Sequence, residues 1–336
     1  MPLPTHADVV AARARIAPFI VRTPMLRHRV LDDRTGGSIL IKPEPLQRTG
    51  SFKLRGATNA IQRLGAEAMR GVVTHSSGNH GQATACAAAA VGAKATIFMP
   101  HDAPRIKMDS TAGWGADIIH YDRVTDDRDA ITRAYADRTG AILVPPFDHE
   151  DVIAGQGTLA MELAEDAAAA GLALDALLVC TGGGGLIAGC ALALEGISPA
   201  TKIYAVEPEG WDDTGRSLAS GTRQGNEPGG SMLCDALLAK MPGEMTFAVN
   251  QPRLAGAIAV TDAEVMAAIR FAFLHLKLVV EPGGAVCLAA VLAGKFATEG
   301  RTVGVVISGG NVDPAVFGRC LGGLWRGRRG RSGLSL

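Results

Sequence analysis

The 336-residue chain lacks an excess of charge of either sign, because its 33 basic side chains are balanced by 33 acidic ones. A protein that binds nucleic acid or a membrane surface usually draws its affinity from a basic excess. The formal charge of zero therefore argues against both kinds of partner. The only basic cluster is WRGRRGRSGLSL at the end of the chain, whose glycines and missing apolar periodicity predict a disordered basic tail over residues 326–336.

The chain also lacks paired cysteines and long apolar runs. Its six cysteines form no CxxC pair, and most lie in apolar runs such as DALLVC, which predicts buried thiols in a reducing compartment. The first residues, MPLPTHADVV, have no basic-then-apolar signal pattern, and no run is long enough to span a bilayer. We therefore expect a soluble, cytoplasmic protein with no membrane partner.

Short apolar runs rich in β-branched residues do occur, and they alternate with helical patterns. This alternation predicts an α/β fold whose mostly parallel sheets are flanked by helices. The expected strands span residues 38–42, 71–75, 94–99, 117–120, 141–145, 176–180, 202–206 and 303–307. Four of them run into small polar turns, namely SSGNHG, TGGGG, EPEGWDD and SGGN. Since ligands in such folds lie at the carboxyl ends of the strands, these turns predict a shared cleft.

The run TGGGGLIAG contains four successive glycines between a strand and a helix: Gly182, Gly183, Gly184 and Gly185. N–H groups turned inward here, together with the helix N-terminus, would suit a phosphate. No GK[ST] follows, so the run is not a P-loop, and it does not match a dinucleotide fingerprint. A tight turn needs only one or two glycines, so four favour an anion site.

Two further turns carry polar groups that could bind ligands. In HSSGNHG, Ser76, Ser77 and the N–H groups through Asn79 and His80 could hold a carboxylate, although on this turn alone a cluster of helix caps is the better explanation. In EPEGWDD, acidic side chains within one turn suit a hard cation such as magnesium or calcium, although acidic loops are often merely solvated.

The stretch TGSFKLRGATNA places Lys53 in the first turn of an expected helix that Thr49 or Ser51 could cap. The lysine could simply be solvated there. Alternatively, it could be held in a pocket, where desolvation lowers the pKa of its amine and makes it a nucleophile. The stretch alone leaves both interpretations open.

The lysine of SFKLRG, the asparagine of SSGNHGQ, the tetraglycine run and the final SGGN together resemble one family. In this order they look like the pyridoxal-phosphate enzymes of the tryptophan-synthase-β fold (fold type II), in particular the threonine/serine dehydratase and serine racemase group. The resemblance covers residues 5–320 and also includes VIAGQGT and EPGG. It implies two domains, each with a parallel twisted sheet flanked by helices, and the cofactor in the cleft between them. Residues 1–70 and 149–325 would form the large domain and residues 71–148 a small mobile one.

The resemblance also implies a role for each motif. Lys53 would hold pyridoxal phosphate as a Schiff base, and the pyridine ring would contact Phe52, Asn79 (at its hydroxyl) and Ser308 (at its nitrogen). The phosphate would bind to Gly182, Gly183, Gly184 and Gly185. The substrate carboxylate would bind to Ser76, Ser77, Gly78, Asn79 and His80. A divalent cation, most simply Mg²⁺ but also Ca²⁺ or Mn²⁺, would bind to Glu207, Asp213 and the carbonyl of Trp211.

The implied activity is a dehydratase (ammonia-lyase) that converts L-threonine or L-serine to a 2-oxo acid and ammonia, with Lys53 as general base. Serine racemase is an alternative, since Lys53 and Ser77 could act on opposite faces of the substrate. So is 3-hydroxyaspartate dehydratase, if Arg128 reaches the pocket and binds a second carboxylate. A homodimer is the expected assembly. A catalytically silent cofactor carrier is a further possibility, which the combination of Lys53, Asn79 and Ser308 disfavours. A nucleotide-binding regulator built around TGGGG is a weaker alternative.

Overall fold

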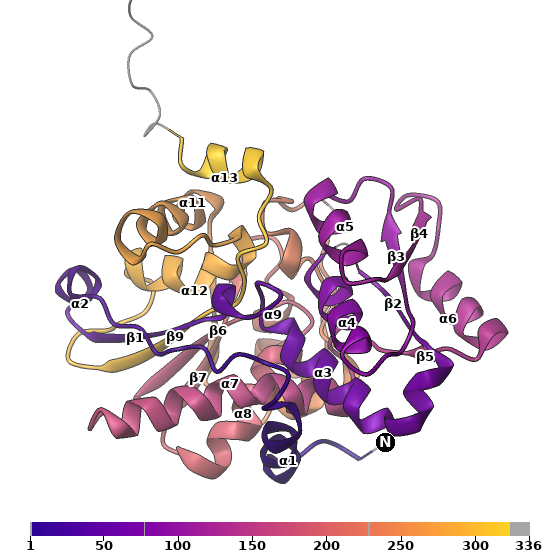
Figure 1. Cartoon of the computed structure of the whole chain (residues 1–336). Coiled ribbons are helices and arrows are strands. Elements are labelled where there is room, and N and C mark those ends of the chain that lie inside the picture. Colours follow the sequence, from indigo (N-terminus) through magenta and orange to yellow (C-terminus); the bar gives the residue numbers. More distant parts are fainter. Residues whose placement is uncertain (1, 77, 228, 323–336) are drawn as a thin grey trace, which may run out of the picture.

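The computed structural model describes residues 2–76, 78–227 and 229–322. In this part of the chain, two parallel β-sheets stand side by side, and each has helices on both faces (Figure 1). The predicted α/β fold class is therefore confirmed. The predicted tail over residues 326–336 lies outside the described residues. None of the described helices combines the length and the apolar character that a membrane span would need.

The first sheet has the strand order β1-β9-β6-β7-β8, and the second has the order β4-β3-β2-β5. All neighbouring strands are parallel. The strands are β1 (Ser38–Pro43), β2 (Val72–His75), β3 (Ala95–Pro100), β4 (Asp117–Tyr121), β5 (Ile142–Leu143), β6 (Ala176–Cys180), β7 (Lys202–Pro208), β8 (Gly256–Val260) and β9 (Thr302–Ile307). The sequence predicted all of these except β8, a partly exposed strand at the edge of the first sheet.

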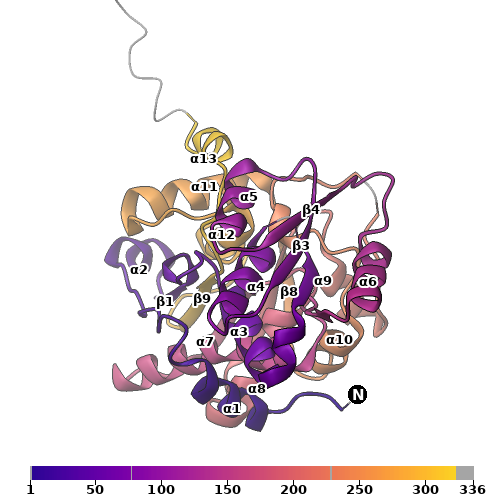
Figure 2. The ribbon, with the colours of Figure 1, turned by 45° about the vertical axis from the view of Figure 1, so that its right-hand side comes forward.

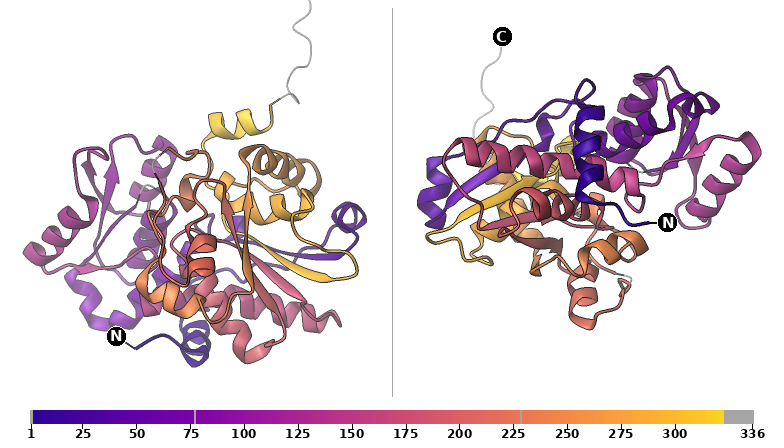
Figure 3. Two further views of the ribbon diagram at one scale, coloured as in Figure 1. Left: turned by 180° about the vertical axis from the view of Figure 1, so that it is seen from behind. Right: turned by 90° about the horizontal axis from the view of Figure 1, so that it is seen from below.

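The first sheet is buried on both faces because its residues alternate in direction. Leu177 and Val179 pack against one group of helices, whereas Leu178 and Cys180 pack against another. The first group is α1 (His6–Ile16), α7 (Glu150–Ala169) and α8 (Gly185–Ile197), and the view from below in Figure 3 shows the long helix α7 crossing this face. The second group is α2 (Arg29–Thr35), α11 (Asp262–Phe271), α12 (Pro282–Leu292) and α13 (Pro314–Cys320).

The second sheet follows the same rule (Figure 2). Ile97 packs on the side of α3 (Lys53–Leu64), α4 (Asn79–Ala89) and α5 (Arg105–Ala112), and its neighbour Phe98 packs on the side of α6 (Arg128–Thr139). The remaining elements are short: α9 (Asp213–Ser220), α10 (Glu244–Asn250), the 3-10 turns η1 (Glu44–Leu46), η2 (Gly65–Arg70) and η3 (Asp235–Leu237), and the π-helical turn η4 (Ala272–Leu276).

Helix α3 connects the two sheets, because it packs against both α7 and α4. It approaches α7 closely where two glycines meet: a Cβ on Gly155 would lie 2.6 Å from the carbonyl oxygen of Arg55, and one on Gly56 would clash with Gln156. The strands of the second sheet all lie within the predicted small domain, residues 71–148. The mobility of that domain stays a prediction.

Candidate functional site

A cleft opens between the two sheets, at the carboxyl ends of β2, β6 and β9. Its wall includes most of the residues that the sequence singled out. These are Phe52, Lys53, Ser76, Gly78, Asn79, His80, Arg128, Gly182, Gly183 and Ser308. Ser77 lies outside the described residues. Segments up to about 250 residues apart in the sequence thus meet at one place, as expected where parallel strands end together.

Lys53 is the first residue of α3, and the start of this helix is attached to the end of β9. The N–H of Phe52 donates to the carbonyl oxygen of Ser308 (3.0 Å), and Ser51 forms a bridge with Gly309. The predicted capping by Thr49 or Ser51 is wrong: Phe52 occupies the cap position, and no side chain caps the helix. The two side chains are buried in this connection instead. The connection fixes Lys53 beside Ser308.

The amine of Lys53 faces the cleft and donates to the carbonyl oxygen of Pro146 (2.6 Å). Burial lowers the pKa of this amine from 10.5 to about 8, and the nearby carboxylate of Glu281 opposes the shift. The neutral form of this amine is therefore much more populated near pH 7 than it is in a solvated lysine. Of the two interpretations of the sequence, the geometry favours the lysine in a pocket.

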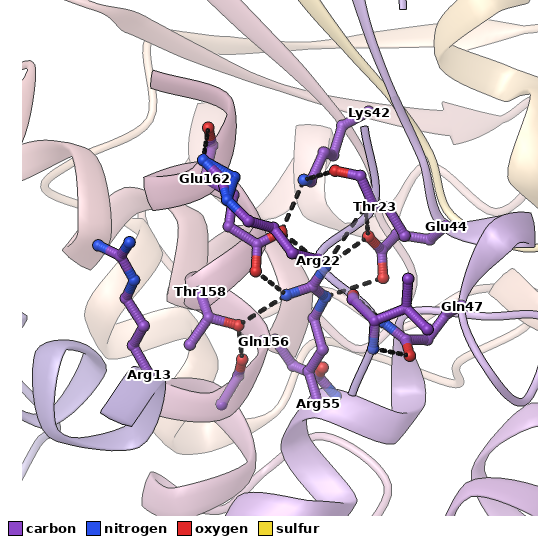
Figure 4. A network of polar contacts seen from close by, with 12 residues as sticks. Arg13, Arg22, Thr23, Lys42, Glu44, Gln47, Arg55, Gln156, Thr158 and Glu162 are labelled. Atoms are coloured by element: carbon purple, nitrogen blue, oxygen red, sulfur yellow. Dashed lines mark hydrogen bonds and ion pairs between the residues drawn. The ribbon is translucent and has the colours of Figure 1, made fainter. Parts of the chain in front are cut away.

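The first turn of α3 is anchored from the side opposite to the cleft. Figure 4 shows the fully buried guanidinium of Arg55, which forms paired hydrogen bonds of 2.8–2.9 Å with both Glu44 and Glu162. Lys42 donates to Glu162 (2.6 Å) and to the carbonyl oxygen of Thr23 (2.6 Å), which brings the four charges to a net zero. Such bidentate pairs are strong and directional. They hold α3 against η1 and α7, two residues from Lys53. The sequence analysis missed this network.

The glycine run forms a turn whose carbonyl groups are held by α10. Thr246 donates to the carbonyl oxygen of Gly183 (2.7 Å), and Asn250 donates to that of Gly184 (3.2 Å). Gly184 has a φ of +87°, and a Cβ on Gly183 would lie 2.6 Å from the ring of Phe147, so neither position accommodates another residue. Within the described part of the chain, the N–H groups of residues 182–187 donate to no protein acceptor. The turn therefore offers donors that suit an anion, and the predicted phosphate site stays a prediction.

The first turn of α4 contributes Asn79 and His80. The amide of Asn79 donates to Glu281 (2.6 Å) and accepts from Asn311 (2.8 Å). His80 donates through Nε2 to the carbonyl oxygen of Val144 (2.9 Å), and burial lowers the pKa of its ring to about 3, so the ring is neutral and its Nδ1 carries no proton. The imidazole therefore cannot donate to a carboxylate. Of the polar groups of His80, only the backbone N–H, which the sequence analysis named, can do so.

Arg128 begins α6 and lines the same cleft. Its side chain is 42% exposed, and its nearest acidic neighbour, Asp129, lies 3.8 Å away. That carboxylate is already bonded to His75 at 2.9 Å. The guanidinium of Arg128 is thus available to a ligand in the cleft, in contrast to that of Arg55.

Several lining residues were missed by the sequence analysis. Lys107 of α5, which is itself buried, forms an ion pair of 2.6 Å across the cleft with the partly exposed Asp235 of η3. Glu281 is buried just behind the cleft wall at the start of α12, where it bonds to the lining residue Asn79; the sequence analysis included its EPGG motif in the resemblance but assigned Glu281 no role. Pro146 and Phe147 lie in a segment that reads as a linker because of its prolines. Nothing in the local sequence distinguishes these residues.

The predicted metal ligands lie apart from this cleft: Glu207 is near the end of β7, and Asp213 is the first residue of α9. Backbone N–H groups of Thr214 and Gly215 donate to the two carboxylate oxygens of Glu207, at 2.9 Å each. Asp213 accepts from Asn226 through Oδ1 (2.6 Å), while its buried Oδ2 has no partner among the described residues. Burial and the neighbouring Asp213 raise the pKa of Glu207 to about 8, and burial raises that of Asp213 to about 6. The described residues contain no group of three or more His, Cys, Asp or Glu side chains placed to hold a metal.

Comparison with known proteins matches residues 16–309 to the family "Pyridoxal-phosphate dependent enzyme". An L-threo-3-hydroxyaspartate ammonia-lyase of Saccharomyces cerevisiae is 43% identical over 96% of this chain and 98% of its own. A maize serine racemase structure has a TM-score of 0.89 and 36% identity, and covers 95% of this chain and 97% of its own. The structure of a threonine deaminase of Solanum lycopersicum has a TM-score of 0.87 and 32% identity, with 94% and 92% coverage. These relatives support the predicted group, and the names of the first two correspond to the alternative activities, 3-hydroxyaspartate ammonia-lyase and serine racemase, rather than to an L-threonine or L-serine dehydratase.

Proposed function

The chain belongs to the pyridoxal-phosphate-dependent enzymes, and within this family we propose that it is a 3-hydroxyaspartate ammonia-lyase. It would convert the substrate to a 2-oxo acid and ammonia. This proposal replaces L-threonine and L-serine as the first choice of substrate. The observation that carries it is the position of Arg128 in the same cleft as Lys53, with a half-exposed side chain whose ion pair with Asp129 is long, at 3.8 Å.

Three features of the site fit the cofactor. The free N–H groups of residues 182–187 suit its phosphate, and Ser308, which is 4% exposed in the cleft, can face its ring nitrogen. The amine of Lys53, with a pKa of about 8, can bond to its aldehyde. When bound, pyridoxal phosphate supplies a conjugated electron sink that makes the α-proton of an amino acid acidic.

Each step of the proposed reaction can then be assigned to particular residues of the chain. Lys53 takes the α-proton as general base, because a pKa of about 8 leaves a much larger neutral fraction of its amine at physiological pH than an ordinary lysine has. The N–H groups at the start of α4 hold the α-carboxylate. Because a serine hydroxyl does not keep the ring nitrogen protonated as a carboxylate would, Ser308 moderates the electron sink and favours prompt loss of the β-hydroxyl.

The role of Arg128 is to recognise the second carboxylate. 3-Hydroxyaspartate carries a carboxylate where serine carries only hydrogen and threonine a methyl group. An exposed guanidinium at the rim of the cleft can form two parallel hydrogen bonds with such a group. A charged hydrogen bond of this kind contributes about 1.5–3 kcal/mol, which corresponds to about 10- to 150-fold in kcat/KM.

The test compares Arg128→Gln with Arg133→Gln, an exposed position on the same helix. The purified holoenzyme is assayed for oxo acid and ammonia with L-threo-3-hydroxyaspartate, L-serine and L-threonine, and Lys53→Ala serves as the inactive control. We expect wild type to prefer hydroxyaspartate. Arg128→Gln should lower kcat/KM for this substrate by about 10- to 100-fold and leave that for L-serine nearly unchanged. Equal losses on all substrates, or a wild-type preference for L-threonine, would overturn the proposal.

Serine racemase is the second candidate, because the similar maize protein has that name and because the chain has Ser77 opposite Lys53 in the group's pattern. Racemisation needs an acid and a base on the two faces of the substrate. The same assay distinguishes the two activities when D-serine is also measured. Interconversion of serine enantiomers that Ser77→Ala removes, without hydroxyaspartate turnover, would favour the racemase.

We also propose that Glu207, Asp213 and the carbonyl of Trp211 bind Mg²⁺. The unpartnered Oδ2 of Asp213 and two buried carboxylates that repel each other fit a hard cation. The site lies away from the reacting atoms, so the ion would stabilise the fold.

A further inference from the structure

One buried carboxylate beside the cleft has no part in the mechanism above. Glu281 is 1% exposed and precedes α12. Its backbone N–H donates to the carbonyl oxygen of Gly309 (3.1 Å), and its Oε1 accepts from the amide of Asn79 (2.6 Å). A Cβ on Gly309 would clash with Oε1, so the glycine of SGGN makes room for this carboxylate. Burying a carboxylate costs free energy, so the burial of Glu281 calls for a functional explanation.

The hydrogen bonds around Asn79 have a fixed direction. The carbonyl oxygen of Thr49 can only accept, and it takes a hydrogen bond from Nδ2 of Asn311 (2.8 Å). The same NH₂ group donates to Oδ1 of Asn79 (2.8 Å). Oδ1 of Asn79 therefore faces Asn311, and its NH₂ group faces Glu281. The backbone carbonyl of Thr49 can only accept, so it fixes the orientation of Asn311 and, through it, that of the Asn79 amide, without an arbitrary choice between O and N.

We propose that Glu281 is the positioning residue for Asn79. Its carboxylate holds one N–H of the amide and so directs the other N–H of the same NH₂ group at the cleft that Asn79 lines. That second N–H is a donor for the hydroxyl oxygen of the pyridine ring. Without the acceptor at Glu281, the amide can rotate and present Oδ1, which repels that oxygen. The inference rests on the proposed function only through the cofactor, and it is independent of the substrate.

The test is a double-mutant cycle read by cofactor affinity. Apo protein is titrated with pyridoxal phosphate, and the dissociation constant and the visible absorption band of the bound cofactor are measured for wild type, Glu281→Leu, Asn79→Ala and the double variant. Glu281→Leu should weaken binding by about 10-fold, the value of one well-placed hydrogen bond. The double variant should bind no more weakly than Asn79→Ala, because Glu281 acts only through the amide.

Glu281→Gln is the matched control, since its side-chain oxygen can still accept from Asn79. We expect its affinity and absorption band to stay near those of wild type. If Glu281→Leu weakens binding as strongly in the Asn79→Ala background as in wild type, Glu281 acts on its own and the inference is wrong. If Glu281→Leu does not fold, Asn311→Ala removes the other end of the chain and must show the same dependence on Asn79.

The cycle also separates this inference from the proposed function. Failure of wild-type protein to bind pyridoxal phosphate would contradict both. If wild-type protein binds pyridoxal phosphate normally but turns over only L-serine, the hydroxyaspartate proposal is wrong. The double-mutant cycle can still be interpreted in that case.

Discussion

The two sides of the first turn of α3 differ in how completely their polar groups are satisfied. On the side away from the cleft, every N–H of Arg55 has an acceptor, and the side chains of the network are buried. On the cleft side, buried polar atoms of Glu281 (Oε2) and His80 (Nδ1) have no partner among the described residues. The N–H groups of the glycine run are equally free in that part of the chain.

This difference follows from what each side has to do. A buried charge network is rigid only when all its members are paired, and a rigid support keeps Lys53 in place. A binding site needs unused hydrogen-bonding capacity, since groups already satisfied within the protein have little to offer a ligand. The two arrangements lie within a few residues of each other along α3, and three measurements test the contrast between them.

The largest effect is expected in the network. Arg55→Met leaves two buried carboxylates with one lysine between them, which should lower the free energy of unfolding by about 3–5 kcal/mol. Arg63→Met is the control on the same helix: its ion pair with Asp151 involves an arginine side chain that is 50% exposed, so the loss should stay below about 1 kcal/mol. Urea unfolding of the three apo proteins measures both values. Similar losses for the two variants would mean that the buried network does not anchor α3.

The proposed cation site should respond next. Mg²⁺ at about 100 times its dissociation constant should raise the free energy of unfolding by about 2.7 kcal/mol, because it binds only the folded chain. Thermal unfolding in MgCl₂ and in EDTA measures the shift. Asp213→Asn should abolish it, whereas Glu209→Gln, at an exposed position after the same strand, should retain it. A shift that persists in Asp213→Asn would place the ion elsewhere.

The smallest effect concerns Lys53. Because its pKa is lowered to about 8, the neutral amine that bonds to the cofactor is the main form above that pH and falls about tenfold per unit below it. The rate at which apo protein takes up pyridoxal phosphate, followed by absorbance, should therefore rise with pH and level off above about 8. A rate that still climbs toward 10.5, the ordinary value for lysine, would show that the amine is solvated after all.

The sequence predicted eight of the strands because apolar, β-branched runs bounded by turns are a local signal. It missed β8, whose GAIAV run is short and begins at a glycine, and which pairs only with β7 at the sheet edge. The six cysteines are buried and free, as their apolar surroundings predicted. The capping of α3 was predicted wrongly, because Thr49 and Ser51 are used to attach this segment to Asn311 and Gly309 rather than to cap the helix.

The fold class, the glycine turn and the position of the cleft at the strand ends could be read from the amino-acid order, because each depends on residues adjacent in the chain. Which side chains complete the site is set by packing in three dimensions. Asn79 and Glu281 are 202 positions apart, Lys107 and Asp235 are 128 apart, and Arg55 and Glu162 are 107 apart. No local pattern encodes such pairs, because a hydrogen bond depends on distance in space, and only packing of the two sheets around α3 brings these groups within reach.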